Sequence, residues 1–386
     1  MKATFTPTPG IDRREVLGAD DVTDAELEAM VADLWGEPAV RLLASTAERV
    51  AYDVPSMLTG ARTWVRGHAD PGTGARPFEF FVKRVQHWRH SPMFAFVPPE
   101  LAAWAATTVP WRSEVLLYGS DLAARLPDGL TMPRALRVED RPDDTAVLWL
   151  ESVEHDPAPW VADDDARAAY LLGRLSGSPR VAGLADIDPQ PWHISYFVEG
   201  RLAHTVFPVL ADDAVWAHPA VAEHFGDLRP DLRAVAARLD RLAQEYAALP
   251  HRASHGDACP NNLMRHLDGT GYTLIDYGFW RPQPVGFDLS QLLVGEIQVR
   301  RLDADDLPER AATCLEAYAE GLAAEGSAVE PDVLRRCHAV SLMLFNGLPS
   351  IPVEALGEDD QEAVAHHVAQ RAQVARYAFD VLAATD

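Results

Sequence analysis

One segment in the second half of the chain constrains the fold more than any other. Residues 262–266 have the pattern of a short strand, and after a turn that contains Asp-Gly, residues 272–276 have the pattern of a returning strand. In the antiparallel register that we predict, Asn262 faces Asp276. The two side chains are therefore expected at the open end of a hairpin, with Asp257 in the loop that leads into it.

These three oxygen-bearing side chains indicate a chemistry. Oxygen ligands without a His or Cys cluster suit Mg²⁺, which typically takes one or two carboxylates together with substrate phosphates. Phosphoryl transfer needs such a cation and a carboxylate that orients and deprotonates the attacking hydroxyl. We therefore predict Asp257 as the catalytic base, and Asn262 and Asp276 as the metal ligands.

The same segment resembles a known family. The pattern His255-Gly256-Asp257, four residues and then Asn262 resembles the catalytic loop of the aminoglycoside phosphotransferase and choline kinase families, which share the protein-kinase-like fold. Their metal-binding Ile-Asp pair is similar to the pair that ends at Asp276. The resemblance implies an ATP- and Mg²⁺-dependent enzyme that phosphorylates a hydroxyl of a small polar molecule.

The resemblance also implies supporting residues. A later aspartate that holds the catalytic loop is matched by Asp288, and His255 is expected to hold the loop rather than to act as a base. A lysine on the third strand of the small lobe is matched by Lys83, in an apolar strand. Its helix partner is matched by Glu114, although an insertion over residues 87–109 separates the two.

The nucleotide is expected to contact two further segments. Backbone groups around Gly60, in a turn between the first two strands, are expected to cover the phosphates, with help from Thr59 or Arg62; an ordinary β-turn explains this segment equally well. By resemblance, the backbone carbonyl of Glu151 and the N–H of Val153 are expected to bind the adenine edge.

The order of these segments predicts an α+β chain with a protein-kinase-like bilobal fold, in which a β-rich small N-lobe precedes a mainly helical large C-lobe. We expect an N-terminal arm at 1–19 that is poorly ordered or loosely docked, an N-lobe at 20–150, a hinge connector at 151–154 and a C-lobe at 155–386.

Local patterns add detail to the N-lobe. A capping box, with Thr23 at its start, opens a helix that ends at Gly36. Strands are predicted at 50–57, 63–67 and 78–85. Helical spacing follows at 110–126.

Composition excludes several classes of protein. The net charge of −24 repels phosphate backbones, so nucleic acid is not an expected partner. The sequence contains no run of 18 apolar residues, so no membrane span is expected, and the N-terminus lacks the apolar core of a signal peptide. The three cysteines show no paired or zinc-like spacing. We expect a cytoplasmic protein whose partner is a small-molecule acceptor.

Other functions remain open. A protein Ser/Thr kinase would use the same parts, but no Ala-Pro-Glu signature follows Asp276. A non-catalytic nucleotide-binding regulator would not need Lys83, Asp257, Asn262 and Asp276 together, yet all four residues are present. A metal-dependent hydrolase gives Lys83 no role. An amine-bearing acceptor is one hypothesis, with Glu296 and the acidic residues at 354–360 as candidate contacts.

Two histidine-containing segments have less specific patterns. Trp192-His193 lies in an apparently irregular segment at 185–200, which is either a lid or a long connection. His366-His367 lies on a late helix and is predicted to be solvated surface.

Overall fold

The structure is a computed structural model that describes residues 11–51 and 56–386. The chain divides into two compact units. The first comprises Met1–Ala124 and Met132–Glu154, and the second comprises Arg125–Thr131 and His155–Asp386.

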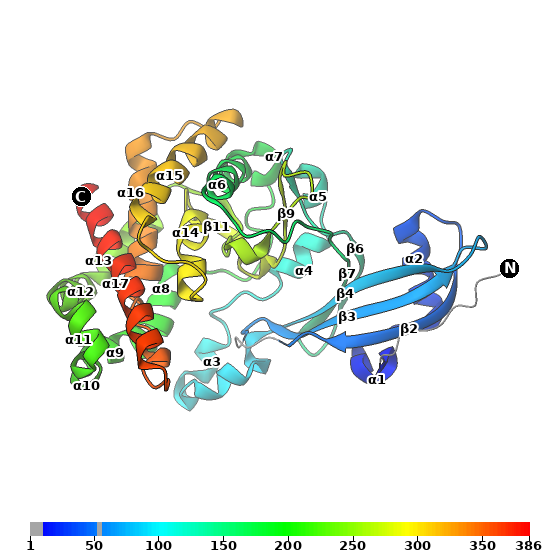
Figure 1. The fold of residues 1–386 in the computed structure, drawn as a ribbon, viewed down its shortest axis with the longest axis horizontal. Helices are drawn as coiled ribbons and strands as arrows, with labels where there is room; N and C mark the ends of the chain where they lie inside the picture. The colour runs from blue at the N-terminus through cyan, green and yellow to red at the C-terminus, as the bar shows by residue number, and fades with distance from the viewer. Residues whose placement is uncertain (1–10, 52–55) are drawn as a thin grey trace. The chain divides into compact units, whose positions relative to one another are not determined.

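In the described residues, the first unit is built on a six-stranded antiparallel sheet with the order β1-β2-β3-β4-β7-β6 (Figure 1). Its strands are β1 (Ile11–Asp12), β2 (Arg41–Arg49), β3 (Thr59–Asp70), β4 (Arg76–Gln86), β6 (Ala135–Asp140) and β7 (Thr145–Glu151). The helices of this region are α1 (Arg13–Leu17), α2 (Asp24–Trp35), α3 (Ala102–Ala105), α4 (Ser113–Tyr118) and α5 (Leu122–Arg125), the last at the passage into the second unit.

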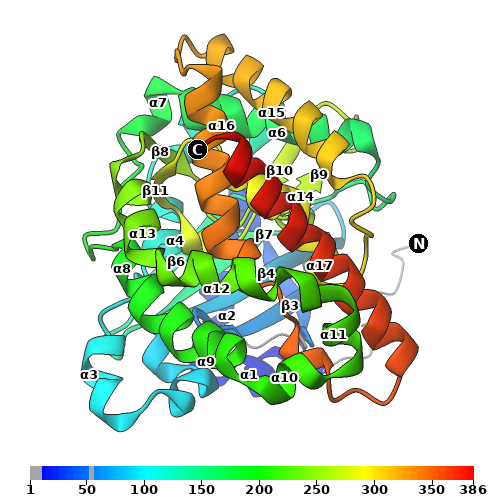
Figure 2. The same cartoon turned by 90° about the vertical axis from the view of Figure 1, so that its left-hand side faces the viewer.

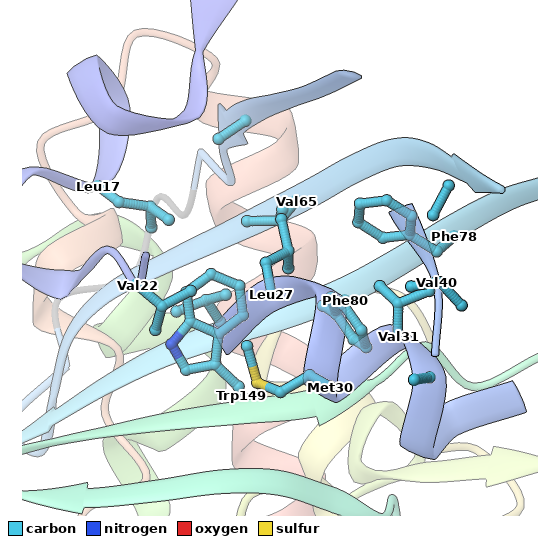
Figure 3. Close-up of a cluster of buried hydrophobic side chains, with 14 of the residues drawn as sticks. Leu17, Val22, Leu27, Met30, Val31, Val40, Val65, Phe78, Phe80 and Trp149 are labelled. Carbon is cyan, nitrogen blue, oxygen red and sulfur yellow. The ribbon is translucent and has the colours of Figure 1, made fainter. Parts of the chain in front are cut away.

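Helix α2 covers one face of this sheet. Its predicted capping box at Thr23 is present, and it ends at Gly36 in a left-handed conformation, as glycine allows without strain. Leu27 of α2 packs in one cluster with Phe80 and Trp149 from the sheet (Figure 3). All three are almost fully buried, and each such side chain contributes about 1.5–3 kcal/mol.

The hairpin of β3 and β4 is confirmed, but the first long strand lies earlier than predicted. The strand expected at 50–57 is β2 at Arg41–Arg49, and residues 52–55 of the expected strand lie outside the described residues. The sequence of β2 is mostly polar and small, so its own pattern is weak. Its pairing with β3 determines its conformation.

The N-terminal segment is also different from the expected loosely docked arm over residues 11–19. Ile11–Asp12 pairs with β2, and the Arg13 side chain that follows is fully buried. Arg13 forms an ion pair with Asp21 at 2.7 Å and another with Asp24 at 2.9 Å. This buried cation fixes the segment to the first unit.

The long helix predicted at 110–126 is broken into two short helices. Helix α4 ends at Gly119, and the Ser120 hydroxyl donates back to the Leu117 carbonyl and accepts from the N–H of Leu122. These hydrogen bonds of the Ser120 hydroxyl take the place of the backbone hydrogen bonds of a continuous helix. The preceding insertion packs through Trp88, whose indole N–H donates to the Ala105 carbonyl at 2.7 Å.

The second unit is mainly helical. Its helices are α6 (Ala162–Gly177), α7 (Pro179–Ala182), α8 (Ile194–Phe197), α9 (Phe207–Ala211), α10 (Asp213–Ala217), α11 (Pro219–Phe225), α12 (Arg229–Ala237), α13 (Leu239–Ala248), α14 (Asp288–Gln298), α15 (Leu307–Ala324), α16 (Pro331–Leu342) and α17 (Gln361–Ala384). Its short strands are β5 (Leu130–Thr131), β8 (His251–Ser254), β9 (Leu263–Arg265), β10 (Tyr272–Leu274) and β11 (Arg281–Pro284).

Helices α6 and α15 form the tightest helix pair of this unit (Figure 2). A Cβ on Gly173 of α6 would lie 2.2 Å from a backbone oxygen of α15, and one on Gly321 of α15 would lie 2.0 Å from a backbone oxygen of α6. The start of α6 is held by buried ion pairs, Asp164 with Arg265 at 2.6 Å and Asp165 with Arg310 at 2.8 Å.

Part of the segment expected to be irregular at 185–200 is helical. Residues 194–197 form α8, and Val198–Val206 continue as a π-helix. A second π-helical turn lies at Met343–Gly347. The rings of Phe197 and Phe345 stack with centroids 4.3 Å apart, which joins the two regions.

Replacing Arg13 tests how firmly the N-terminal segment is docked. Arg13→Met should lower the free energy of unfolding by about 3–5 kcal/mol, because it leaves the largely buried Asp21 carboxylate without its counter-charge. The matched control is Arg14→Met, since Arg14 is exposed and should cost no more than about 0.5 kcal/mol. Urea unfolding of the full chain measures both; equal small losses would contradict the docking.

Candidate active site

The predicted catalytic loop follows β8 in the second unit. Strand β8 pairs antiparallel with β11, and Ser254 at the end of β8 lies opposite Arg281. The chain then leaves the ladder as His255-Gly256-Asp257. The side chains of Asp257, Asn262 and Asp276 are all half-buried, so solvent reaches them.

A buried carboxylate holds this loop. Asp288, at the start of α14, accepts hydrogen bonds from the backbone N–H of His255 at 3.0 Å and of Gly256 at 2.8 Å. Burial raises the pKa of Asp288, while the neighbouring His255 and the two N–H donors lower it. These are the contacts expected of a residue that supports the loop.

Gly256 cannot be replaced without moving the loop. Its φ of 85° is a conformation that L side chains rarely adopt, and a Cβ there would lie 2.1 Å from the Phe279 carbonyl oxygen. The loop therefore lies directly against the segment that follows Asp276.

His255 is fully buried and hydrogen-bonded through both ring nitrogens. Its Nδ1 accepts from the Asp257 N–H at 3.3 Å, so its Nε2 is the protonated nitrogen and donates to the Ile275 carbonyl at 3.0 Å. The ring thus links the loop to the hairpin, in agreement with a structural role.

Asn262 contacts Asp257 directly. Its Nδ2 donates to the Asp257 backbone carbonyl at 2.9 Å and to the Asp257 carboxylate at 3.1 Å. Both partners are acceptors, so the orientation of the amide is determined. Its Oδ1 is left for another ligand.

The hairpin forms, but its predicted register is wrong by one residue. Leu263 pairs with Leu274, and the N–H of Ile275 donates to the Asn262 carbonyl at 3.1 Å, so Asn262 faces Ile275 rather than Asp276. The cause is tertiary. Strand β5 pairs in parallel with β10, and Gly271 lies so close to the backbone of Gly129 that a Cβ would not fit.

Asp276 follows the ladder with an unusual backbone. Its φ of 63° and ψ of 64° place a non-glycine residue in the left-handed region. Such strain persists only where surrounding structure imposes it, and it is common in active sites. The conformation ends the strand and redirects the chain at the residue predicted to bind the metal.

The donor atoms at this site suit Mg²⁺ better than a softer metal. The Asp257 and Asp276 carboxylates and the Asn262 amide oxygen are all hard donors. In the described residues, no group of three or more His, Cys, Asp and Glu side chains is arranged to hold a metal. A Mg²⁺ site with two protein ligands plus phosphate oxygens does not require such a group.

The loop also packs against α14. A Cβ on Gly295 would lie 2.8 Å from the Cβ of Cys259. Burial raises the pKa of the Cys259 thiol above its ordinary value, which rules out a reactive thiolate. Glu296, next on α14, is half-buried, and its Oε1 makes no hydrogen bond to any residue that the structure describes and lies 3.8 Å from Arg301.

Two of the other acidic candidates for acceptor contacts, Glu358 and Asp360, have structural partners. Glu358 forms a bidentate pair with Arg300 at 2.7 Å, and Asp360 caps the N-terminus of α17. His366 is exposed, but His367 is buried, so the prediction of solvated surface is wrong for His367. The helix packs this side chain inward because it faces the core of the unit.

In the first unit, Lys83 and Glu114 form an ion pair. The Lys83 Nζ lies 2.6 Å from the Glu114 Oε2, and both side chains are almost completely buried. Val82 packs in the cluster that includes the residues of α2. Because successive side chains of a strand point to opposite faces, the neighbouring Lys83 lies on the other face of β4. The predicted contact is present although α4 is short.

The segment predicted to cover the phosphates is a strand, not a turn. Thr59, Gly60 and Arg62 lie in β3, with a bulge at Gly60. Arg62 is directly opposite Lys83 on β4, so the two side chains leave the same face of the sheet. Residues 52–55, between β2 and β3, lie outside the described residues.

The connector starts where β7 ends. The Glu151 N–H donates to the Arg134 carbonyl at 3.0 Å, and the Glu151 carboxylate accepts from the Arg134 N–H at 2.8 Å. Val153 follows in a segment without regular structure. Nothing in these contacts assigns either residue to adenine.

Sequence reasoning missed Arg281, which is buried beside the catalytic segment. The sequence shows only that an arginine follows Asp276 by five positions, and this spacing alone indicates no role for Arg281. The aromatic partner, Trp192, is 89 positions away (281 − 192) and could not be inferred.

A family model described as the phosphotransferase enzyme family matches residues 122–331, which include the predicted catalytic loop, both predicted metal ligands and Asp288. The chain belongs to the phosphotransferase enzyme family. The predicted family and the prediction of a small-molecule kinase are thereby confirmed. No curated protein matches the chain by sequence.

Solved phosphotransferases share the fold. An aminoglycoside phosphotransferase from Alicyclobacillus acidocaldarius is 15% identical, with 88% of this chain and 91% of that chain covered and a TM-score of 0.50. An amicoumacin kinase in complex with AMP-PNP, Ca²⁺ and Ami is 14% identical, with 94% of this chain and 96% of that chain covered and a TM-score of 0.51. The α+β, kinase-like fold class is confirmed.

One further property of this phosphotransferase concerns membranes. None of the helices in residues 11–51 and 56–386 combines the length and the apolar character needed to cross a lipid bilayer.

The contacts of Asp288 predict the effect of its amide analogue. Asp288→Asn keeps the shape but replaces one acceptor oxygen by an NH₂ that faces a backbone N–H. We expect a loss of about 1.5–3 kcal/mol in the free energy of unfolding and a fall in kcat of this phosphotransferase. Asp332→Asn, on the exposed face of α16, is the control. Wild-type stability and kcat in Asp288→Asn would show that the two hydrogen bonds do not hold the loop.

Proposed function

We propose that the protein transfers the γ-phosphate of ATP, with Mg²⁺, to a hydroxyl group of a small polar molecule. The observation that carries the proposal is the contact between Asn262 and Asp257 inside a loop held by Asp288. Two further observations support phosphoryl transfer. The chain belongs to a family of phosphotransferases, and the loop carries the solvent-accessible carboxylate of Asp257.

In this proposal Asp257 orients the acceptor hydroxyl and takes its proton. Two features support it. The Asn262 amide fixes one carboxylate oxygen at 3.1 Å, and the His255 ring accepts the Asp257 backbone N–H. A positioned base near the attacking oxygen needs no large motion at the moment of transfer.

Asn262, through its Oδ1, and Asp276 are the proposed Mg²⁺ ligands. The cation would neutralise charge that develops on the phosphates. The amicoumacin kinase was solved with AMP-PNP and Ca²⁺, an adenine nucleotide and a cation that takes oxygen ligands. This supports a nucleotide and a divalent cation as the cofactors.

On the nucleotide side, Lys83 is proposed to bind the α- and β-phosphates and Glu114 to position its ammonium group. A cation that is buried in an apolar strand and paired with a helix carboxylate fits this role. Thr59, Gly60 and Arg62 are proposed phosphate contacts from the backbone and side chains of β3.

Adenine recognition is proposed for the backbone carbonyl of Glu151 and the N–H of Val153. The acceptor is proposed to be an aminoglycoside, an amino sugar, a choline-like compound or a related metabolite. For an amine on that acceptor, Glu296 is the proposed contact, because its Oε1 lacks a hydrogen bond and it adjoins Cys259 of the catalytic loop.

A metabolite screen tests the proposal as a whole. The purified protein is incubated with Mg-ATP and a mixed metabolite extract, and mass spectrometry identifies any compound that gains one phosphate. We expect at least one small hydroxyl compound to gain it. Phosphate gain on proteins alone, or on nothing while AMP-PNP fails to bind, would overturn the proposal.

Asp257→Asn separates chemistry from binding. The change removes the base but keeps the side-chain shape, so kcat should fall by about 10²–10⁴ while the affinity for ATP changes little. Steady-state kinetics with the acceptor found in the screen, together with calorimetric titration of AMP-PNP, measure the two quantities. Near-normal kcat in the folded variant would remove Asp257 from the mechanism.

Lys83→Ala should raise the KM for ATP, because a positioned cation is lost from the phosphates and Glu114 is left buried without its partner. Lys83→Arg should restore activity only in part, since the planar guanidinium cannot replace a compact ammonium. An exposed surface cation, Arg41, provides the matched Arg41→Ala control. Wild-type KM for ATP in Lys83→Ala would contradict the phosphate role.

A further inference from the structure

Arg281 is a buried cation beside the catalytic loop that the proposed mechanism does not use. It lies on β11, five positions after Asp276, and pairs in the ladder with Ser254, which directly precedes the loop. Only 8% of the residue is exposed.

The contacts of Arg281 are aromatic and leave part of its guanidinium group free. Its Nε donates to the Phe279 carbonyl at 3.2 Å, and its guanidinium carbon lies 4.8 Å from the centroid of the Trp192 ring and 5.8 Å from that of Phe279. Its two terminal nitrogens make no hydrogen bond to any described residue, and they keep contact with solvent.

Three other buried arginines in the described part of the chain have close carboxylate partners. Arg13, Arg265 and Arg310 each have an aspartate oxygen within 3 Å. For Arg281, no carboxylate oxygen of a described residue lies within 4.0 Å. Arg371 shares this property, but its Nη2 donates to the backbone carbonyl of Pro349.

A desolvated guanidinium without an anion is unfavourable, so such a group is retained where it gains a partner from outside. Burial lowers the pKa of Arg281 to about 10, while Asp188 and Tyr246 act to raise it, so the group remains cationic at neutral pH. Stacking on Trp192 fixes the plane of the guanidinium, and its free edge carries two parallel N–H donors. This edge matches a carboxylate or a phosphate.

The aromatic partner of Arg281 belongs to the same unit as the catalytic segment and lies in a connection that contacts residues next to it. Trp192 precedes α8 in the chain, and the indole N–H of Trp280, the residue before Arg281, donates to the Leu184 carbonyl at 2.9 Å. The connection between α7 and α8 is thereby held against residues 277–281. All of these residues belong to the second unit, together with Asp257.

We propose that Arg281 binds an anionic group, a carboxylate or a phosphate, on the acceptor that this protein phosphorylates. The inference rests on the proposed phosphotransfer and narrows the acceptor to the related metabolites that carry an acidic group, in place of an aminoglycoside or a choline-like compound. The acceptor then carries an acidic group in addition to the hydroxyl that receives the phosphate, and Trp192 packs against the guanidinium that holds it.

The first experiment measures binding and does not depend on turnover. Thermal unfolding is followed with saturating AMP-PNP and Mg²⁺, and malonate or inorganic phosphate is added at constant ionic strength. We expect the anion that fits to raise the unfolding midpoint of the wild type by about 2–4 °C. Malonate and phosphate distinguish a carboxylate from a phosphate as the bound group.

Two variants make this result specific. Arg281→Met keeps the apolar stem and should abolish the shift, whereas Arg281→Lys should keep a smaller one. Arg335→Met, which removes an exposed arginine of α16, is the control with the same change in charge and should keep the full shift. No shift in the wild type, or an equal shift in Arg281→Met, overturns the proposal.

The second experiment measures selectivity with matched acceptors. Glycerate and glycerol, serine and ethanolamine, and glycerol 3-phosphate and glycerol differ by an acidic group. We expect kcat/KM to favour the acidic member by about tenfold or more, and Arg281→Met to bring the ratio close to one. An effect of Arg281 on folding alone would lower both members equally and leave the ratio unchanged, which would overturn the proposal.

Failure of the inference can be told apart from failure of the proposed function. Transfer that is confined to neutral or cationic acceptors overturns the anion site and leaves the kinase assignment intact. Absence of both AMP-PNP binding and phosphate transfer overturns the kinase assignment itself.

Discussion

The pair of hydrogen bonds from the catalytic loop to the buried carboxylate of Asp288 is the interaction on which the candidate site depends. Two successive backbone N–H groups point at one carboxylate, which only a sharp turn with glycine at position 256 allows. The same aspartate begins α14. That helix therefore positions the loop at its first residue and, further along, contacts Cys259 and presents Glu296. The loop that carries Asp257 and the acidic residue Glu296 are therefore connected through one helix.

The buried cations of the described residues differ in their partners. In an acidic chain of net charge −24, Arg13, Arg265 and Arg310 are each neutralised by nearby aspartates. These three ion-paired arginines therefore stabilise the fold. Lys83 forms an ion pair with Glu114, and an ammonium group has three N–H donors, so it can also donate to a phosphate. Arg281 has no close carboxylate among the described residues and stacks on an aromatic ring instead. Desolvation is costly in every case, so the absence of a close anion is informative.

Much of the fold was predictable where local chemistry is strong. The capping box at Thr23 and the two strands that pair as β3 and β4, the second of which carries Lys83, follow from capping and alternation. Predictions were wrong where local signals are weak or conflict. Strand β2 is largely polar, α4 is interrupted by Ser120, and Ile11–Asp12 forms a strand only because β2 lies beside it. Propensity is a weak guide when a partner strand supplies the stabilisation.

The candidate site shows the same division. The sequence by itself determined the spacing from His255 to Asn262 and the position of Asp276, because these residues lie close along the chain and their order limits how they can meet. Asp288 is more distant along the chain and was predicted by its resemblance to the family's supporting aspartate. The tertiary structure decided the register that puts Asn262 opposite Ile275, because pairing with β5 and the contact with Gly129 come from a distant segment. It also decided that Arg281 meets Trp192. The contact of Lys83 with Glu114 was predicted by resemblance to the family and not from the local pattern. Local patterns specify backbone conformation and which face is apolar, whereas contacts between distant side chains depend on how the whole chain packs.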